Sequence, residues 1–455
     1  MKKVGPRLYV PVLIAATATF SPTSSGQEID EVIVTARLQS SAQALLNERM
    51  EDDAVKDVIG SEMIGRIGDT TVAAALRRVA GLSLVNNKFV YVRGLGERYS
   101  SSTLNGAVIP SPDLTRNVIP LDIFPTSIVE SLSVQKSYAP EQRASFGGGN
   151  IDIRTKGIPD AFTWSIEASG GVNSEVSDLI SYNGSGDDDL GSDDGKRALS
   201  LTITEAITRF RGTLNANGIL NTLLQESQDV TLADAQDLNR EIALALNRDI
   251  SISPVSDDPD FGIKASMGNN FFLDRYWEVG FQIAAGYSAK WRKTETLSRD
   301  FGLPDEQFER ESETTRSVDL NGNANFGVRF TQDHEITTTH LFVRNTDDET
   351  SVTDRWTDNF QYSDYSAGDG RGLRDSKLQF EEREMTVHQI KGEHLLGFDT
   401  RDAFPSLPLD MIPEGLTISW QYSEAEASTS IPNEVTVRSS VFVDSPAQVN
   451  LNQGA

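Results

Sequence analysis

The sequence predicts an α+β domain followed by antiparallel β-strands that cross a membrane as part of a β-barrel. Residues 45–157 mix helical and strand patterns, whereas residues 158–455 contain long segments in which apolar and polar side chains alternate. Beyond the N-terminal region no segment is apolar enough for a transmembrane helix, so the exported chain is either soluble or crosses a membrane with strands. We expect about seven such strands.

The N-terminus has the features of a secretory signal, which we assign to residues 1–26. Lys2, Lys3 and Arg7 form a basic start, and the apolar stretch from Leu8 to Phe20 is too short to span a bilayer as a helix. The chain has no cysteine, which excludes disulfides and thiol catalysis. Its net charge of −26 disfavours nucleic acid as a partner.

Residues 27–44 form a linking segment that contains a short strand-forming sequence. This sequence consists of Glu31, Val32, Ile33, Val34, Thr35 and Ala36. Residues 32–35 are all β-branched, which favours an extended backbone, and the mixed polar sequence around them offers no partner strand. The segment therefore suits β-augmentation, in which it adds to the sheet edge of another protein. A frayed strand that packs on its own domain explains the pattern equally well.

Residues 45–157 have the pattern of one compact α+β unit. Thr70 or Asp69 can cap a helix over residues 71–79, and Gly81 can end it in the left-handed conformation. Strands are predicted at residues 82–85, 89–92, 128–134 and 150–156. Asn86-Asn87 and Asn105-Gly106 are expected to form the turns of two hairpins, because these residues accept positive φ angles.

The clearest alternating segment is residues 277–291. Phe281 and Ile283 belong to its apolar face, and Glu278 and Gln282 belong to its polar face. A transmembrane strand needs about nine to eleven residues with this pattern. A large soluble sandwich or barrel is the alternative interpretation.

The spacing of the alternating segments supports a membrane barrel, because short turns and long loops follow each other. Strands are predicted near residues 162–172, 261–272, 277–291, 317–331, 335–346, 378–396 and 415–424. Tight turns are predicted at residues 274–276 and 332–334, and long loops at residues 173–260, 292–316 and 347–377. In the first loop, Leu238, Ile242 and Leu246 indicate a small helix on the barrel mouth.

The sequence contains no recognisable catalytic constellation, and we predict no enzyme activity, cofactor or metal. Gly94-Leu95-Gly96 lacks the third glycine of a dinucleotide-binding loop. His340 and His388 are expected on neighbouring strands, but no third ligand clusters with them. The acidic stretch at residues 175–194 does not have the spacing of a calcium loop and is read as a solvated loop.

Several motifs, in this order along the chain, resemble those of TonB-dependent outer-membrane receptors. The resemblance covers residues 1 to about 400. Residues 31–36 resemble the TonB box, and residues 92–99, 104–106, 120–125 and 146–156 resemble the plug domain. The plug-motif residues are Arg93, Gly94, Gly96, Arg98, Asn105, Gly106, Gly147, Gly148 and Gly149.

The resemblance implies that a plug at residues 45–157 fills a barrel that begins at residue 158. Ligand would bind at the plug apex, where Arg98, Tyr99, Asp113 and Arg116 are the candidates. Plug arginines, namely Arg93, Arg98, Arg116, Arg143 and Arg154, are expected to pair with lumen carboxylates such as Glu278 and Asp319. Barrels of this family have 22 strands, so about seven strands would form an incomplete barrel. We therefore expect an N-terminal fragment, from a truncated gene or a partial record.

The expected function is energy-coupled uptake of an unknown small ligand across the outer membrane of a Gram-negative bacterium. The expected partners are the TonB energy-coupling protein, which would engage the box, and outer-membrane lipid. The alternatives are a passive porin or surface-adhesion barrel, a non-functional remnant, and a soluble exported binding protein.

Overall fold

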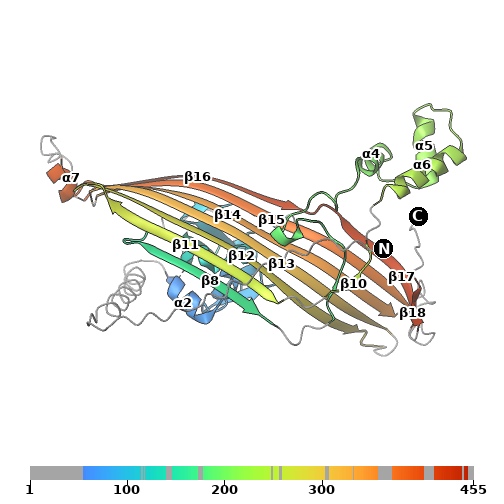
Figure 1. The fold of residues 1–455 in the computed structure, drawn as a ribbon, viewed down its shortest axis with the longest axis horizontal. Helices are drawn as coiled ribbons and strands as arrows, with labels where there is room; N and C mark the ends of the chain where they lie inside the picture. Colours follow the sequence, from blue (N-terminus) through green and yellow to red (C-terminus); the bar gives the residue numbers. More distant parts are fainter. Residues whose placement is uncertain are drawn as a thin grey trace, which may run out of the picture. The chain divides into compact units, whose positions relative to one another are not determined.

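The computed structural model shows an α+β domain that packs against one face of a long antiparallel sheet (Figure 1). It describes residues 55–113, 116, 118–139, 146–172, 178–246, 250–255, 259–302, 307–331, 333–356, 371–403, 415–442 and 445–448. The predicted signal and the segment Glu31–Ala36 lie outside these residues.

The α+β domain is built on a five-stranded sheet with the order β1-β6-β7-β4-β5. These strands are β1 Lys56–Gly60, β4 Ser100–Leu104, β5 Ala107–Val108, β6 Val129–Gln135 and β7 Gly149–Thr155, and a separate hairpin pairs β2 Leu82–Val85 with β3 Phe89–Val92. The helical elements are α2 Ser61–Ile67, α3 Val72–Leu76 and the 3₁₀ turns η1 Glu97–Tyr99, η2 Leu121–Ile123 and η3 Thr126–Ile128. The strands predicted for this domain are all present.

The predicted hairpin turns are confirmed, and the predicted helix cap is wrong. Asn86 and Asn87 have φ angles of 52° and 55°, and Asn105 and Gly106 have 50° and 82°. The cap of α3 is Thr71, whose side chain accepts a hydrogen bond from the Ala74 amide. Asp69 instead binds the guanidinium of Arg78 at 2.8 Å, and the helix ends at Leu76, well before Gly81.

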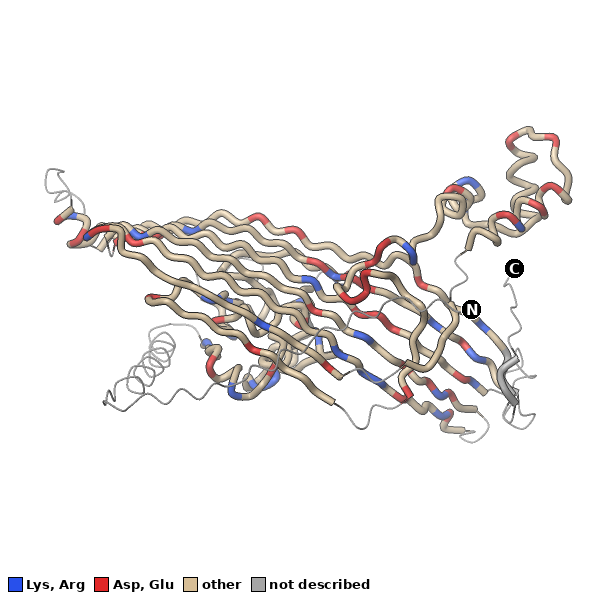
Figure 2. Tube along the Cα trace, in the orientation of Figure 1, with Lys and Arg blue, Asp and Glu red and all other residues tan. Residues whose placement is uncertain are grey.

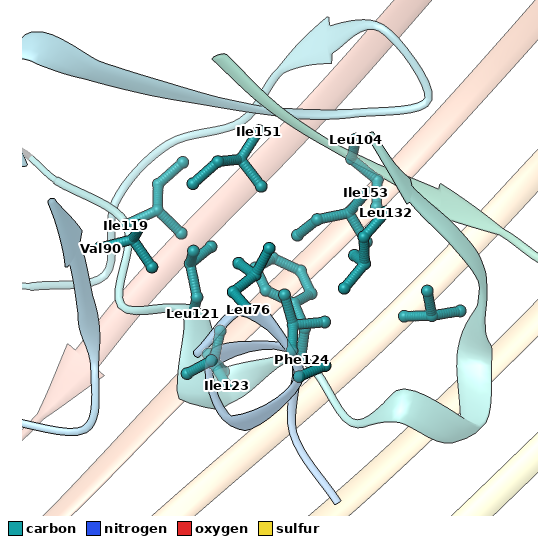
Figure 3. Close-up of a cluster of buried hydrophobic side chains, with 14 of the residues drawn as sticks. Leu76, Val90, Leu104, Ile119, Leu121, Ile123, Phe124, Leu132, Ile151 and Ile153 are labelled. Atoms are coloured by element: carbon teal, nitrogen blue, oxygen red, sulfur yellow. The ribbon is translucent and has the colours of Figure 1, made fainter. Parts of the chain in front are cut away.

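The core of the domain continues into the long sheet. Ten of its buried side chains are labelled in Figure 3: Leu76, Val90, Leu104, Ile119, Leu121, Ile123, Phe124, Leu132, Ile151 and Ile153. Leu341, Val343, Met385 and Val387 of the long sheet belong to the same buried cluster. The domain and the sheet therefore share one apolar core in this region.

The long sheet has nine strands and follows the order β18-β17-β15-β14-β13-β12-β11-β8, with β16 paired to β15 beside β17. The strands are β8 Thr163–Gly171, β11 Asp260–Phe272, β12 Trp277–Arg299, β13 Phe308–Phe330, β14 His334–Trp356, β15 Arg371–Leu395, β16 Thr417–Ser430, β17 Glu434–Phe442 and β18 Ser445–Gln448. All seven predicted strands are present. Strands β17 and β18 are additional, so the predicted number was too low.

The predicted loops at residues 292–316 and 347–377 were mostly wrong, because the strands continue through them. Strands β12 and β13 stay paired as far as Arg299 and Phe308. Figure 2 shows charged residues gathering toward these strand ends, away from α7 Phe398–Ala403. Ion pairs such as Arg355–Glu309 at 2.8 Å bridge neighbouring strands there. Cross-strand charge pairing thus supports strands that lack an apolar face.

The predicted loop at residues 173–260 contains several elements of its own. These are β9 Ile180–Ser181, η4 Asp188–Leu190, α4 Leu201–Arg209, α5 Ala216–Gln225, α6 Leu232–Leu244 and β10 Ser253–Pro254. The predicted helix is α6, which begins with a capping box between Thr231 and Asp234. Helices α4, α5 and α6 bury a small core of their own around Ile219 and Ile242.

We predict that Gly149→Ala destabilises the α+β domain by about 1–3 kcal/mol through overpacking. A Cβ at residue 149 would lie 2.6 Å from Cγ2 of Val92, whereas a Cβ at Gly96 would meet nothing within 4 Å. Hydrogen exchange of the buried Leu132 and Ile153 amides measures the effect, with Gly96→Ala as the control. Equal protection of the domain in the two variants would contradict the packing described here.

Candidate functional site

The candidate site is the interface between the α+β domain and the sheet. We call the sheet face that contacts this domain the inner face and the opposite one the outer face. Gln389 on β15 reaches the domain from the inner face, where its Nε2 donates to the Leu104 carbonyl at 2.9 Å. Asn325 on β13 donates to the Lys156 carbonyl at 2.5 Å. The predicted polar face of the sheet is thus the face that contacts the domain.

One buried ionic cluster joins the two parts. Arg383 on β15, whose side chain is 3% exposed, lies 3.1 Å from the carboxylate of Asp122 on η2. The same guanidinium lies 3.2 Å from Asp347 on β14 and also donates to the Asn345 side chain. Lys88, in the β2–β3 turn, lies 3.9 Å from Asp122 and 3.8 Å from Asp347. Arg383 also lies 4.0 Å from Glu381 on its own strand, so two cations face three carboxylates in this cluster.

Most of the other polar contacts that the described residues make across the interface are neutral hydrogen bonds, and Lys290 on β12 adds a charged donor to the Thr70 hydroxyl at 3.4 Å. Asn105, at the tip of the β4–β5 hairpin, donates to Gln389 at 3.0 Å, and its carbonyl accepts from Gln421 at 3.0 Å. Ser127 donates to Asn321 at 3.3 Å. Such bonds have a net value of about 0.5–1.5 kcal/mol each and can be exchanged for bonds to water. The ionic cluster is consequently the contact most costly to open.

A cavity of about 250 Å³ lies between the domain and the inner face of β8, β11, β12 and β13. Thr70, Thr71, Asp122 and Pro125 line it from the domain. Lys264, Lys290, Asp319 and Asn321 are among the sheet residues that line it. Asp122 therefore belongs both to the cavity wall and to the ionic cluster.

The plug-motif residues meet in space, and their contacts are structural. Gly147 lies against Tyr99, Gly148 against Leu95 and Gly149 against Val92. Arg93 and Gly94 have positive φ angles of 53° and 78°, as a tight turn after β3 requires. Gly106 donates to Asp152 at 2.8 Å, and the Asn105 side chain accepts from the Thr155 amide at 2.9 Å. These residues fix the domain's own turns.

The four candidate ligand residues fall into two pairs. Arg98 and Tyr99 lie on η1, and Tyr99 is 55% exposed. Asp113 and Arg116 lie in the connection between β5 and η2, where the Asp113 carboxylate accepts from the Arg116 amide at 2.7 Å. The Arg116 guanidinium lies 4.8 Å from the centre of the Phe89 ring. The structure thus gives Arg116 a packing role, and ligand contact by these residues stays a prediction.

The expected pairing of plug arginines with lumen carboxylates is wrong for the carboxylates that were named. Glu278 binds Arg329 of the sheet at 3.2 Å, and Asp319 accepts from Ser288 at 3.1 Å. Arg154 lies 3.2 Å from Asp152 of its own domain. Arg143 lies outside the described residues. The arginine of the observed cluster lies on the sheet and pairs with a carboxylate of the predicted 120–125 motif, whereas Lys88 of the domain pairs with Asp347 of the sheet in the expected polarity.

The acidic segment after β8 is folded onto the outer face of the sheet. Tyr287 donates to the Asp189 carbonyl at 2.7 Å, and Thr346 donates to the Gly191 carbonyl at 2.6 Å. Arg197, at the end of this segment, lies 2.6 Å from Asp188 and 3.0 Å from Asp348. The expected solvated loop is thus only partly observed, because Asp188 and Asp193 bind the buried Arg197. Other described acids of the segment are exposed, among them Asp187, Asp189 and Asp194.

The electrostatics of this segment keep Arg197 charged. Burial lowers the pKa of Arg197, but hydrogen bonds to Asp188 and Tyr182 outweigh burial, so the pKa is raised.

In the described residues no set of three or more His, Cys, Asp or Glu side chains is arranged to hold a metal ion. No helix in the described part of the chain is long and apolar enough to cross a membrane.

We predict that Arg383→Met loosens the α+β domain on the sheet by about 3 kcal/mol, the lower end of the range for a broken buried ion pair, because it removes a buried guanidinium from the half-buried carboxylates of Asp122 and Asp347. Hydrogen exchange of the Leu121 and Ile123 amides measures this opening. Arg374→Met is the matched control, since Arg374 binds Asp354 at 2.6 Å within the sheet. A similar change in both variants, or in neither, would exclude a special role for the cluster.

Residues 48–151 match the family model described as the TonB-dependent Receptor Plug Domain. No curated protein sequence matches the chain. Similar solved structures include the siderophore receptor PirA from Pseudomonas aeruginosa, with 10% identity over 85% of this chain and 55% of that chain and a TM-score of 0.27. A ferric enterobactin receptor (PfeA) mutant from Pseudomonas aeruginosa has 10% identity over 86% and 58%, with a TM-score of 0.29.

The ferric citrate transporter FecA has 12% identity over 88% of this chain and 62% of that chain, with a TM-score of 0.27. The present chain thus spans between 55% and 62% of the length of these three solved chains. Residues 48–151 coincide with the α+β domain that packs on the inner face of the sheet. Residues 48–151 therefore form a plug domain of the TonB-dependent receptor type, and the antiparallel sheet on which this plug rests follows it in the chain.

Proposed function

We propose that the chain serves energy-coupled uptake of a small ligand across the outer membrane of a Gram-negative bacterium, without catalysis. The observation that carries this proposal is a plug domain held on the polar face of a two-faced sheet. A plug that closes a channel must be held firmly at rest and must also be released. The ionic cluster can hold the plug at rest. Once this cluster opens, water can replace the neutral hydrogen bonds around it, so the plug can also be released.

The outer face of the sheet supports a membrane location. Large apolar side chains are exposed there on neighbouring strands: Met267, Phe271, Ile283, Phe326, Val328 and Ile336, each between 40% and 48% exposed. A continuous apolar surface of this kind is unfavourable in water and favourable in lipid. The plug covers the opposite face, so the apolar surface is available to a bilayer.

The apolar surface ends toward the strand ends that lie away from α7. This border crosses the strands obliquely. The first charged outer residue is Lys293 on β12, Arg316 on β13, Arg344 on β14 and Glu424 on β16. Through the strand registers, the last three lie level with Trp291, Tyr287 and Ile283 of β12. On β15 the first charged outer residue is Glu384, directly opposite Arg344. The border therefore descends from β12 to β16 with β14 and β15 level, as expected for strands that tilt by about 35–45° against a flat membrane.

The coupling step is assigned to Glu31–Ala36. Its β-branched centre can pair as an added strand with the edge of the energy-coupling protein's sheet. The recognition would use backbone hydrogen bonds, so most side-chain changes should be tolerated. Pulling on this strand would act on the plug, which begins a short distance along the chain.

We expect Val34→Pro to abolish binding of the TonB periplasmic domain, because proline removes a backbone donor from the added strand. Val34→Thr is the matched control, since it keeps both the donor and the β-branch. Binding of the purified periplasmic domain to the full chain measures the effect. If the proline variant bound as well as the control, residues 31–36 would not be the coupling strand.

Single cysteines test the membrane location, because the chain has none of its own. We expect Ile283→Cys, on the outer face, to react with a lipid-soluble maleimide and to resist a charged one in outer-membrane preparations. Lys264→Cys, in the cavity on the inner face, should show the reverse preference. Ready labelling of Ile283→Cys by the charged reagent would indicate a soluble protein instead.

A further inference from the structure

All the histidines of this chain form two facing pairs on the same two strands. The sequence contains four histidines, and His334 lies opposite His394 while His340 lies opposite His388 across the β14–β15 ladder. The ring centres are 5.4 Å apart in the first pair and 5.0 Å apart in the second. Both pairs lie on the outer face, where the plug makes no contact. The proposed uptake function uses neither.

The first pair is occupied by other contacts. The Thr400 hydroxyl lies 2.9 Å from Nε2 of His334, and Trp420 donates from Nε1 to Nε2 of His394 at 3.1 Å. These contacts anchor the connection between β15 and β16, which contains α7. His334 and His394 therefore have a structural role that their own neighbours explain.

The second pair has no such explanation. Nδ1 of His340 lies 2.8 Å from Nδ1 of His388. Within the described residues this is the hydrogen bond that the two rings make, and it joins them only to each other. His340 is exposed on the outer face. Two nitrogen ligands thus point at the same place from directly opposed backbone positions.

The surroundings of this pair favour a cation. Glu424 on β16 lies opposite His388 in the register, on the side away from His340. Beyond this row the outer faces of β15 and β16 carry Glu382, Glu384 and Glu426. Arg344 on the neighbouring β14 lies 2.9 Å from Glu384. The pair lies just inside the apolar surface, because Phe342 separates His340 from Arg344 on β14, and it is level with the charged Glu424 of β16.

We propose that His340 and His388 bind a transition-metal dication such as Zn²⁺ or Cu²⁺, with Glu424 as a third ligand. Two nitrogens bound to one tetrahedral zinc at about 2.0–2.1 Å each lie roughly 3.3 Å apart. The observed 2.8 Å therefore needs only a small opening of the two rings. In the described residues no third side chain of this kind stands ready beside the two rings. Glu424, which the register places beside His388, must therefore rotate toward the metal to complete a His₂Glu set, and water fills the remaining position. The inference depends on the strand register and not on the proposed uptake.

Copper binding to the full chain in detergent tests this site. We expect one Cu²⁺ whose electron paramagnetic resonance spectrum shows coupling to imidazole nitrogens. His340→Gln or His388→Gln should weaken binding at least tenfold and remove the two-nitrogen pattern. Glu424→Gln should weaken binding several-fold and keep that pattern. His334→Gln and His394→Gln are the matched controls on the same strands, and they should leave binding unchanged.

A cysteine pair separates loss of the site from loss of the fold. His340→Cys combined with His388→Cys should form a disulfide under mild oxidation, because the register places the two residues directly opposite each other. With the register verified in this way, unchanged copper binding in the His340→Gln variant would overturn the proposal. Absence of bound copper in the parent chain, or equal loss in the control variants, would overturn it as well.

Discussion

The structure depends on the uninterrupted pairing of strands β11 to β15, in which successive side chains alternate between the two faces of the sheet. Strands β12 and β13 pair without interruption from Trp277 opposite Phe330 to Arg299 opposite Phe308, and β14 pairs equally regularly with both neighbours. A slip by one residue would exchange the two faces of a strand. Phe281 would then face the plug, and Arg383 would face away from Asp122. The plug seat, the apolar surface and the histidine pairs are therefore three results of one pairing pattern.

The plug interface combines contacts of different strength. Leu341, Val343, Met385 and Val387 give it a small apolar part, and most of its other contacts are amide and hydroxyl groups. Separating the plug from the sheet would remove Asp122 from Arg383 and leave this arginine with Asp347 and Glu381 of the sheet. Once water enters, the carboxylates and the guanidinium are solvated and the neutral bonds can be exchanged. Opening is thus expected to be cooperative, with entry of water at the cluster as the difficult step.

The sequence was most informative where structure is local. Asn86-Asn87 and Asn105-Gly106 predict their turns because the residues that adopt positive φ are few. The helix cap was misplaced because Asp69, Thr70 and Thr71 all have suitable side chains, and only the fold engages Asp69 with Arg78. The strand extensions were missed because charged pairs replace the apolar alternation on which strand prediction relies.

Contacts between distant residues were beyond sequence reasoning. Arg383 and Asp122 are separated by 261 positions, and neither has a local signal that marks its partner. Asp122 belongs to the motif at residues 120–125, so the sequence located this partner of Arg383 but did not indicate that it forms an ion pair with the sheet. Arg197 is similar, because its charge is balanced by Asp348, which is 151 positions away on β14.

The polar side chains of the plug divide into those that hold its turns and its contact with the sheet and those that are exposed to solvent. The motif glycines and Asn105 serve the plug's own turns and its contact with the sheet, so they suit any cargo. Exposed side chains such as Tyr99 are not fixed by these contacts, and the cavity beside Asp122 is lined by both cations and anions. A ligand that displaced Asp122 from Arg383 would weaken the plug seat directly. Ligand recognition and plug release can therefore be linked through one carboxylate, without a change in the fold of either part.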